Sequence, residues 1–259
     1  MSASPFRLDS RTALVTGASG GLGQRFARVL HEAGARLVLT GRDADHPRLV
    51  ALADELGGLR SGSVESLALD VRDAGSVDAL FATLAARDRH VDVLINNAGI
   101  ATGTPAIALE DEDWNAVLET NLRGPWWLAQ RFARACVAKE SPGCIVNIGS
   151  ILGSRVGAGT APYAAAKAGL VHLTRSLALE WARHGIRVNS LSPGYVLTDI
   201  NRTFFETPAG QATVNRVPQR RVADPADLDG ALLLLASDAS SYMTGSDLVI
   251  DGGHLCSAL

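Results

Sequence analysis

TALVTGASGGLGQRFARVLHEAGARLVLTG, residues 12–41, joins two apolar runs through a glycine-rich turn and a helical pattern. The runs TALVTG (12–17) and RLVLTG (36–41) offer apolar residues to both faces, as buried parallel strands do. Between them, GGLGQRFARVLHEAGA (20–35) predicts a helix that ends at Gly34. A strand, a helix and a second strand of this kind form a βαβ unit, so the stretch predicts an α/β fold.

The same alternation continues to the C-terminus. Further strands are predicted over 64–70, 91–99, 143–150, 186–194 and 247–253, and further helices over 46–57, 74–88, 111–138, 162–184 and 225–236. No linker or repeat interrupts the pattern, so residues 1–259 are expected to form a single domain around one doubly wound, seven-stranded parallel sheet with helices on both faces, a Rossmann fold. Ligands of such sheets bind beyond the carboxyl ends of the strands.

Composition narrows the function classes. The chain is 47% hydrophobic with a net charge of −3, and its basic residues are scattered, which argues against nucleic-acid partners. Its longest aliphatic run, 231–236, is far short of the ~20 residues that cross a bilayer, so no membrane association is expected. The polar start is not a signal peptide. Cys136, Cys144 and Cys256 lack metal-site spacing, so we expect reduced thiols, no metal and a cytoplasmic location.

The glycine-rich turn TGASGGLG (16–23) follows a predicted strand and opens a predicted helix. Its glycines at 17, 21 and 23 permit a tight turn, close approach of the backbone to a ligand and close helix packing. The helix start offers free N–H groups and the positive end of the helix dipole to a pyrophosphate. This context predicts dinucleotide binding.

A second motif, YAAAK (163–167), begins the helix predicted over 162–184. Residues four apart share one helix face, and three alanines leave that face open, so Tyr163 and Lys167 can point into one cavity. Taken alone, this motif is better explained by an ordinary amphipathic helix with an extended lysine, and only the rest of the chain reverses that preference. Ser150, 13 residues before Tyr163, ends the strand predicted over 143–150 and can reach the same crevice.

Together the spaced motifs resemble those of the short-chain dehydrogenases/reductases, in the branch of roughly 250 residues. The resemblance covers about residues 8–253 and rests on TGASGGLG (16–23), DV (70–71), NNAG (96–99), Asn121 in ETNLRG, Ser150 in NIGS, YAAAK (163–167) and SPG (192–194). It implies an NAD(P)(H)-dependent oxidoreductase of the EC 1.1.1 type, which interconverts a ketone and a secondary alcohol by hydride transfer.

The resemblance implies a catalytic group of Asn121, Ser150, Tyr163 and Lys167. Tyr163 would be the general acid or base, and Lys167 would lower its pKa and bond the nicotinamide ribose. Ser150 would polarise the carbonyl, as a donor in an oxyanion hole does. Asn121 would hold a water in a proton relay. Taken singly, Ser150 could instead be a turn serine and Asn121 a polar residue satisfied within its helix.

The resemblance also implies the cofactor-binding residues. They are Gly17, Ser19, Gly21, Leu22, Gly23, Arg42, Asp70, Val71, Asn97, Ala98, Gly99, Tyr163, Lys167, Pro193, Gly194, Val196 and Thr198. Asp70 would bond the adenine amino group, and Asn96 either lines the ribose or stabilises the sheet. Gly41 replaces the ribose-binding Asp of NAD enzymes, and Arg42 can clamp a 2′-phosphate. NADP is therefore the expected cofactor and NAD the alternative, because the glycine turn lacks a basic residue.

The segment 195–222 should form a substrate lid by resemblance. The expected substrate pocket consists of Ser150, Leu152, Tyr163, Tyr195, Phe204 and Phe205, with Ile200 nearby. Its apolar side chains favour carbonyl reduction of an apolar small molecule and rank polyols lower, although the two Phe residues could simply dock the lid.

The sequence leaves two alternative functions open, and the resemblance also implies a homo-oligomer. A 3-oxoacyl-(acyl-carrier-protein) reductase is the first alternative, but Leu179 stands where such reductases tend to be basic, and Glu140 follows Lys139. A non-catalytic dinucleotide-binding protein on the same fold is the second. Family members often form homotetramers or homodimers through the helices predicted over 111–138 and 162–184 and through the last helix and strand. Trp126 and Trp127 are candidates for one such interface and for the core.

Overall fold

The computed structural model describes residues 4–199 and 201–256, so the expected lid residue Ile200 lies outside the described residues. All described strands belong to one parallel sheet, as predicted, and their order is β3-β2-β1-β4-β5-β6-β7. Their bounds are β1 Thr12–Val15, β2 Arg36–Gly41, β3 Val64–Ala68, β4 Val93–Asn96, β5 Gly143–Ile148, β6 Ile186–Pro193 and β7 Asp247–Ile250.

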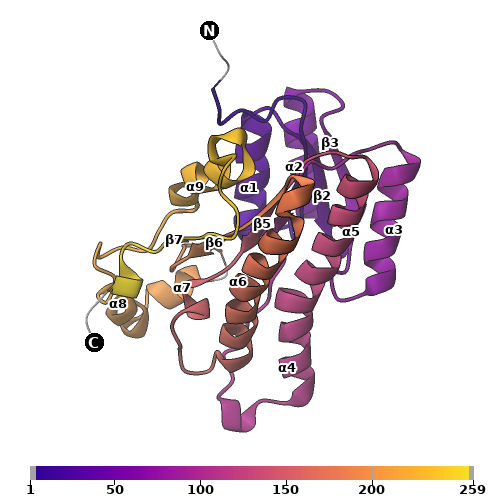
Figure 1. Ribbon diagram of the computed structural model, residues 1–259. Coiled ribbons are helices and arrows are strands. Elements are labelled where there is room, and N and C mark those ends of the chain that lie inside the picture. Colours follow the sequence, from indigo (N-terminus) through magenta and orange to yellow (C-terminus); the bar gives the residue numbers. More distant parts are fainter. Residues whose placement is uncertain (1–3, 200, 257–259) are drawn as a thin grey trace.

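Helices cover both faces of the sheet (Figure 1). The α-helices are α1 Gly21–Glu32, α2 Pro47–Leu59, α3 Ala74–Ala86, α4 Asp111–Leu118, α5 Gly124–Ala138, α6 Ala161–Trp181, α7 Arg202–Phe205, α8 Pro208–Val214 and α9 Asp229–Ala236. One apolar cluster joins the sheet to α1, α2 and α9, and a second joins its other face to α3, α5 and α6. The predicted layers are thus confirmed. No helix within the described part of the chain is long and apolar enough to cross a membrane.

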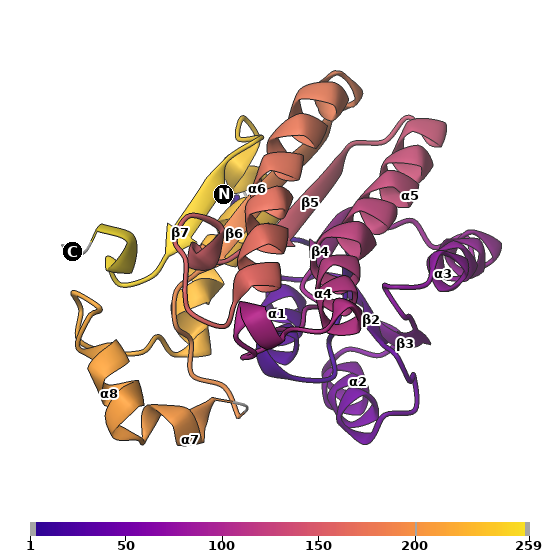
Figure 2. The same ribbon diagram turned by 90° about the horizontal axis from the view of Figure 1, so that it is seen from below.

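The chain reverses its direction of travel across the sheet between β1 and β4. From β1 it proceeds outward through β2 to β3, and it then returns to place β4 on the other side of β1. The loops that leave β1 and β4 therefore diverge at the carboxyl edge of the sheet, which is where a crevice forms in doubly wound folds. Figure 2 shows α7 and α8 beside this end of the molecule, apart from the packed layers.

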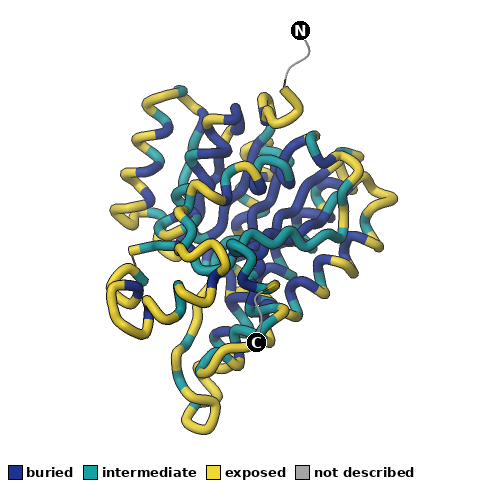
Figure 3. The backbone as a smooth tube through the Cα atoms, turned by 90° about the vertical axis from the view of Figure 1, so that its left-hand side faces the viewer, coloured by how far each residue is buried: buried dark blue, intermediate teal, exposed yellow. Residues whose placement is uncertain are grey.

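The short central strands β1 and β4 are stabilised by their burial in the core. All four residues of β1 and of β4 are buried, because helices cover them on both sides. Figure 3 shows the buried segments concentrated in the middle of the molecule, with exposed segments around them. The sheet is therefore a rigid platform from which the loops at its carboxyl edge project.

One predicted element has a different form. The helix expected over 111–138 divides into α4 and α5, with a π-helical turn at Glu119–Arg123 between them. The Gly124 N–H donates to the carbonyl of Glu119, five residues earlier, and Pro125 has no N–H to continue the α-helical ladder. Turns of this kind are frequent at functional sites, and this one carries Asn121.

Candidate active site

The glycine turn joins β1 to α1 at the centre of the carboxyl edge. Gly17 has a φ of +65°, and a Cβ there would lie 2.9 Å from the Cα of Ala98, so only glycine fits. Gly23 packs directly on the carbonyl of Gly17, where a Cβ would collide. Ser19 and Leu22 are half-buried on either side of this turn. Close backbone contacts at Gly17 and Gly23 therefore determine the conformation of the turn.

The start of α1 is open. Gly20 is the N-cap residue, and no side chain of the described residues caps this helix or places a carboxylate in its first turn. A Cβ at Gly20 or Gly21 would meet nothing within 4 Å. Free backbone N–H groups at a helix start, with open space before them, fit the pyrophosphate of a dinucleotide.

Side-chain hydrogen bonds tie this turn to the end of β4. The Thr16 hydroxyl accepts from the backbone N–H groups of Asn97 and Ala98, at 2.9 and 3.0 Å. The Asn97 amide donates back to the carbonyl of Thr16 at 2.8 Å. Asn96 instead points into the sheet, where its amide donates to the Asn147 side chain at 2.8 Å. Of its two expected roles, the geometry of Asn96 fits stabilisation of the sheet.

The residues expected to contact the adenosine lie at the ends of β2 and β3. Gly41 is buried, and a Cβ there would lie 3.7 Å from the Cβ of Ser19, so the end of β2 adjoins the glycine turn. Arg42 follows and is exposed. Partial burial acts to raise the pKa of Asp70, but hydrogen bonds from Arg72 and the charges of Arg72 and Arg42 hold it below its usual value. Val71 is buried beside this cluster.

Lys167 lies deep in the crevice, on the first turns of α6. Its side chain is buried, and its ammonium donates to the carbonyl of Ile148, at the end of β5, at 2.7 Å. The Nζ also lies 5.5 Å from the centre of the Tyr163 ring. Burial lowers the pKa of Lys167 to about 8, because desolvation disfavours the charged form. Tyr163 and Lys167 therefore lie close together on α6, as their spacing predicts.

Tyr163 and Ser150 meet in the same crevice. Burial raises the pKa of Tyr163 above its usual value, and a hydrogen bond with Ser150 acts in the opposite direction. The Ser150 hydroxyl also accepts from the backbone N–H of Leu152 at 3.1 Å, which fixes the loop after β5. The expected lowering of the tyrosine pKa by Lys167 is not seen. The ammonium is directed to the Ile148 carbonyl, and desolvation is the larger effect.

The π-helical turn presents Asn121 to this cavity. The amide of Asn121 donates to the carbonyls of Ile100 and Val117, at 2.7 and 2.9 Å. Its Oδ1 is buried and has no partner among the described residues. A Cβ at Gly99 would lie 2.7 Å from this oxygen and 3.8 Å from the Lys167 ammonium. A buried acceptor beside an ammonium is a suitable site for a bound water.

The loop after β6 completes the other side of the crevice. Pro193 ends β6, and a Cβ at Gly194 would lie 2.8 Å from the Cα of Asp251, so the chain turns tightly there. Val196 is buried, and its carbonyl accepts from the Asn201 amide at 2.8 Å. Asn201 Oδ1 also accepts from the backbone N–H of Thr198 at 2.8 Å. The segment expected beside the nicotinamide is thus held by its own contacts.

The two phenylalanines expected in the substrate pocket differ in their exposure to solvent. Phe205 is buried and packs edge-on against Tyr195, with ring centres 5.7 Å apart, whereas Phe204 is 43% exposed. Phe205 therefore packs α7 against Tyr195, at the start of the expected lid segment, and this contact is internal to that segment. Sequence reasoning missed His254, whose ring lies 5.5 Å from that of Tyr195, and Arg155, which donates to the His254 carbonyl. Only the three-dimensional arrangement brings these distant residues together.

Sequence reasoning also missed Arg72, which follows the quoted DV motif directly and bonds Asp70. Its position two residues after an aspartate was a usable signal, because such an aspartate commonly accepts from the backbone N–H two residues on. No group of three or more metal-ligating side chains is present within residues 4–199 and 201–256.

Comparisons with known proteins agree with this geometry. The model of the family described as enoyl-(acyl carrier protein) reductase matches residues 17–254. The chain is 38% identical to D-threitol dehydrogenase of Mycolicibacterium smegmatis over 249 residues, which cover 96% of this chain and 94% of that protein. It is 36% identical to the 3-oxoacyl-[acyl-carrier-protein] reductase FabG of Escherichia coli, over 95% of this chain and 97% of that protein.

Solved structures show the same fold with a cofactor. A gluconate 5-dehydrogenase from Burkholderia cenocepacia, in complex with NADP and tartrate, superposes with a TM-score of 0.92 at 36% identity. The match covers 98% of this chain and 98% of that one. The open start of α1, the buried lysine and the matched structure agree on a dinucleotide crevice at the carboxyl edge.

Proposed function

The chain belongs to the short-chain dehydrogenase/reductase family and is an NAD(P)-dependent oxidoreductase that interconverts an alcohol and a ketone, and from this premise we propose that Ser150, Tyr163 and Lys167 carry its catalysis, with Asn121 in support. One observation carries the proposal. The Tyr163 hydroxyl is hydrogen-bonded to Ser150, and the buried Lys167 ammonium lies 5.5 Å from the centre of the Tyr163 ring.

The environments of these groups suit proton transfer. NAD(P)H, when bound, supplies the hydride. Because burial keeps the pKa of Tyr163 high, its hydroxyl holds a proton near neutral pH and can deliver it to the carbonyl oxygen of the substrate. The Ser150 hydroxyl donates a hydrogen bond to the same oxygen as negative charge develops there. A water on Asn121 Oδ1 would link Lys167 to solvent and so return the proton.

The cofactor that we propose is NADP(H), with NAD(H) as the weaker ligand. Arg42 is exposed directly after Gly41, the residue of β2 that adjoins Ser19, and it can form paired hydrogen bonds with a 2′-phosphate. We expect Arg42→Ala to weaken NADPH binding by roughly tenfold or more and to leave NADH binding nearly unchanged. Titration of nucleotide fluorescence with each variant measures both constants. Tighter binding of NADH than of NADPH by the wild type contradicts this proposal.

For the substrate we propose a small polyhydroxylated alcohol or its ketone, in place of the apolar ketone that the sequence favours. Phe205, on which the apolar expectation partly rested, is buried and packs against Tyr195 within the lid segment. The relative D-threitol dehydrogenase is named for a polyol. A carrier-linked substrate has less support. Leu179 is 84% exposed on α6, and Lys139 pairs with Asp88 at 3.2 Å, so these two positions give an acidic carrier no free cation.

Turnover followed at 340 nm tests the function. The panel contains C4 to C6 polyols, aldonates, bulky apolar ketones and an acetoacetyl thioester, each with both cofactors. We expect NADP-dependent oxidation of polyols or reduction of their ketones. Faster turnover of apolar ketones would restore the substrate class expected from the sequence, and faster turnover of the thioester would favour the carrier-linked alternative. No turnover with any compound, together with intact NADPH binding, would favour a binding protein.

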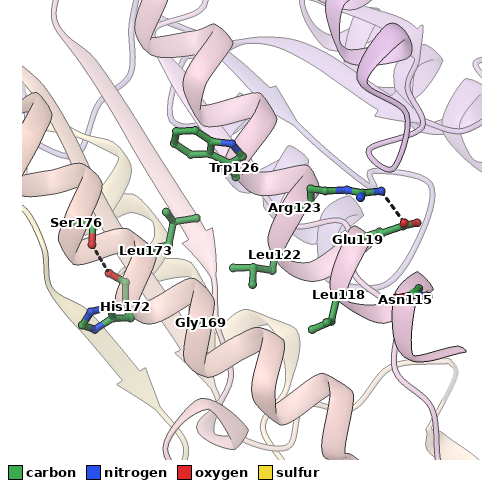
Figure 4. Close-up of a pocket in the computed structure, with 10 residues that line it drawn as sticks. All are labelled: Asn115, Leu118, Glu119, Leu122, Arg123, Trp126, Gly169, His172, Leu173 and Ser176. Atoms are coloured by element: carbon green, nitrogen blue, oxygen red, sulfur yellow. Dashed lines mark hydrogen bonds and ion pairs between the residues drawn. The ribbon is translucent and has the colours of Figure 1, made fainter. Parts of the chain in front are cut away.

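We also propose that the chain forms a homo-oligomer through the outer faces of α4, α5 and α6. A groove of about 560 Å³ runs between these helices, lined by Leu118, Leu122, Trp126, Gly169 and Leu173 among others (Figure 4). Arg123 and Glu119 form an ion pair at its rim, and the Arg123 guanidinium covers the Trp127 ring at 4.8 Å. An apolar face of this kind on an outer surface is typical of an interface.

Light scattering coupled to gel filtration measures the oligomeric state. We expect the wild type to elute as a dimer or tetramer and Leu122→Asp to shift it toward the monomer, because a carboxylate in a closed apolar interface is costly. Leu59→Asp is the matched control, since Leu59 is 73% exposed at the end of α2. A monomeric wild type contradicts the proposed assembly and leaves the proposed chemistry intact.

A further inference from the structure

The loop between β3 and α3 fixes the position of the Asp70 carboxylate through several hydrogen bonds. The Asp70 backbone N–H donates to the Ser76 hydroxyl, in the first turn of α3, at 3.0 Å, and the Asp73 N–H donates to the Asp70 carbonyl at 3.1 Å. The backbone at Asp70 is thus fixed, and rotation of its side chain is the remaining freedom. The carboxylate lies at the adenosine side of the crevice, near Arg42.

Arg72 removes that remaining freedom. Its backbone N–H donates to Asp70 Oδ1 at 2.9 Å, and its Nε donates to the same oxygen at 3.4 Å. Its Nη2 donates to Asp70 Oδ2 at 3.3 Å. The guanidinium therefore spans both oxygens side by side, which fixes the plane of the carboxylate as well as its charge.

The acceptor positions of this carboxylate can be counted. A carboxylate offers about four lone-pair positions, two on each oxygen. Within the described part of the chain, Arg72 fills both positions on Oδ1 and one on Oδ2. One position, on Oδ2, is left for a donor from outside the chain. An exocyclic amino group on a purine is a donor that fits a single charged acceptor.

We propose that Arg72 is a positioning residue for base selection, which orients Asp70 so that its Oδ2 accepts a hydrogen bond from the 6-amino group of adenine. The inference rests on the proposed dinucleotide function and on the assignment of Asp70 to the adenine. It adds that selection of adenine over other purines depends on Arg72. The Asp70–Arg72 ion pair is partly exposed, so it contributes little to stability. The proposed function of this ion pair is to fix the orientation of the Asp70 carboxylate.

The test compares NADPH with its hypoxanthine analogue, in which a carbonyl replaces the 6-amino group. Dissociation constants come from nucleotide fluorescence or calorimetry with the full-length protein, so no turnover is required. The wild type should prefer NADPH by roughly tenfold or more, because one charge-assisted hydrogen bond is at stake. The ratio of the two constants isolates the base, because both ligands carry the same phosphates and respond equally to a change in the protein's charge.

Four variants separate orientation from charge and folding. Asp70→Asn should bring the ratio to about one, because an amide can pair with either base. Arg72→Gln should reduce the ratio by about threefold, and Arg72→Lys should retain more of it than Gln does. Arg87→Gln is the control and should leave the ratio unchanged. Arg87 also pairs with a carboxylate, Glu65 at 2.9 Å, but it follows the last residue of α3, and Glu65 lies in β3 itself.

The outcomes are distinct. An unchanged ratio in Arg72→Gln overturns the inference, as does a wild type that binds both nucleotides equally, and either result leaves the proposed oxidoreductase function standing. A wild type that binds neither nucleotide overturns the proposed function together with the inference. A ratio that falls in Arg72→Gln and not in Arg87→Gln supports the positioning role.

Discussion

The cavity around Tyr163 and the lid over residues 195–222 are built on different principles. Tyr163 and Lys167 lie on α6, in the packed layers, Ser150 lies in the loop after β5, and burial shifts the pKa values of Tyr163 and Lys167. The lid consists of two short helices, α7 and α8, which pack mainly on each other, and Phe205 packs α7 against Tyr195 within the segment. Under the proposed function, reaction chemistry would lie in the packed part of the molecule, and substrate selection in a segment that can change without disturbing it.

The strongest test of this division is Tyr163→Phe. The change removes one hydroxyl from the rigid cavity and leaves the ring in place. We expect kcat to fall by about 10³-fold, because general acid–base groups contribute about 10²- to 10⁴-fold. The dissociation constant for NADPH, measured by fluorescence, should change less than about twofold, since the pyrophosphate site at α1 is untouched. Turnover that survives the change would show that another group transfers the proton.

A second prediction concerns the buried lysine. Burial lowers the pKa of Lys167 to about 8 in the folded protein, from the ordinary lysine value of 10.5 that applies to the unfolded chain. Between these values the unfolded chain binds more protons than the folded one, so the free energy of unfolding rises with pH there. The contribution of this group amounts to about 3 kcal/mol across the window. At neutral pH the lysine is protonated in both states, and its burial opposes folding.

Urea unfolding at pH 7.5 and pH 9.5 measures this effect. We expect Lys167→Met to be more stable than the wild type at pH 7.5 and to lose most of that advantage at pH 9.5. Lys139→Met is the control, because Lys139 is the chain's other lysine and is half exposed. Its effect should be small and equal at both pH values. A constant difference between the wild type and Lys167→Met would mean that the buried amine keeps an ordinary pKa.

The sequence predicts the rigid part of the molecule better than the lid. Every strand and the convergence of Tyr163, Lys167 and Ser150 follow from alternation and spacing, because strand ends in a parallel sheet share one edge. The packing of Phe205 on Tyr195 does not follow, since it depends on how a lid folds back over the sheet. The direction of the tyrosine pKa was also missed. Desolvation depends on the depth of the cavity, which motif spacing does not record.

The division between cavity and lid predicts opposite behaviour for two adjacent phenylalanines. Phe205 is 6% exposed and packs α7 against Tyr195 at the start of the lid segment, whereas Phe204 is 43% exposed. We expect Phe205→Ala to raise KM for the substrate by roughly tenfold, because it removes a buried aromatic contact that positions the lid. Phe204→Ala should change KM by less than about twofold. Both variants should keep kcat within about threefold of the wild type and bind NADPH normally.

Steady-state kinetics with the best substrate of the panel measure KM and kcat separately. Proteolysis of the two variants adds a readout of lid attachment, because a lid that has lost its anchor opens more often and is cut faster. Phe205→Leu should recover part of both properties, since an aliphatic side chain restores some of the buried contact. If Phe204→Ala is instead the variant that raises KM, the exposed ring touches the substrate directly. Phe204 would then belong to the substrate pocket, although it lies on the lid segment and not among the proposed catalytic residues.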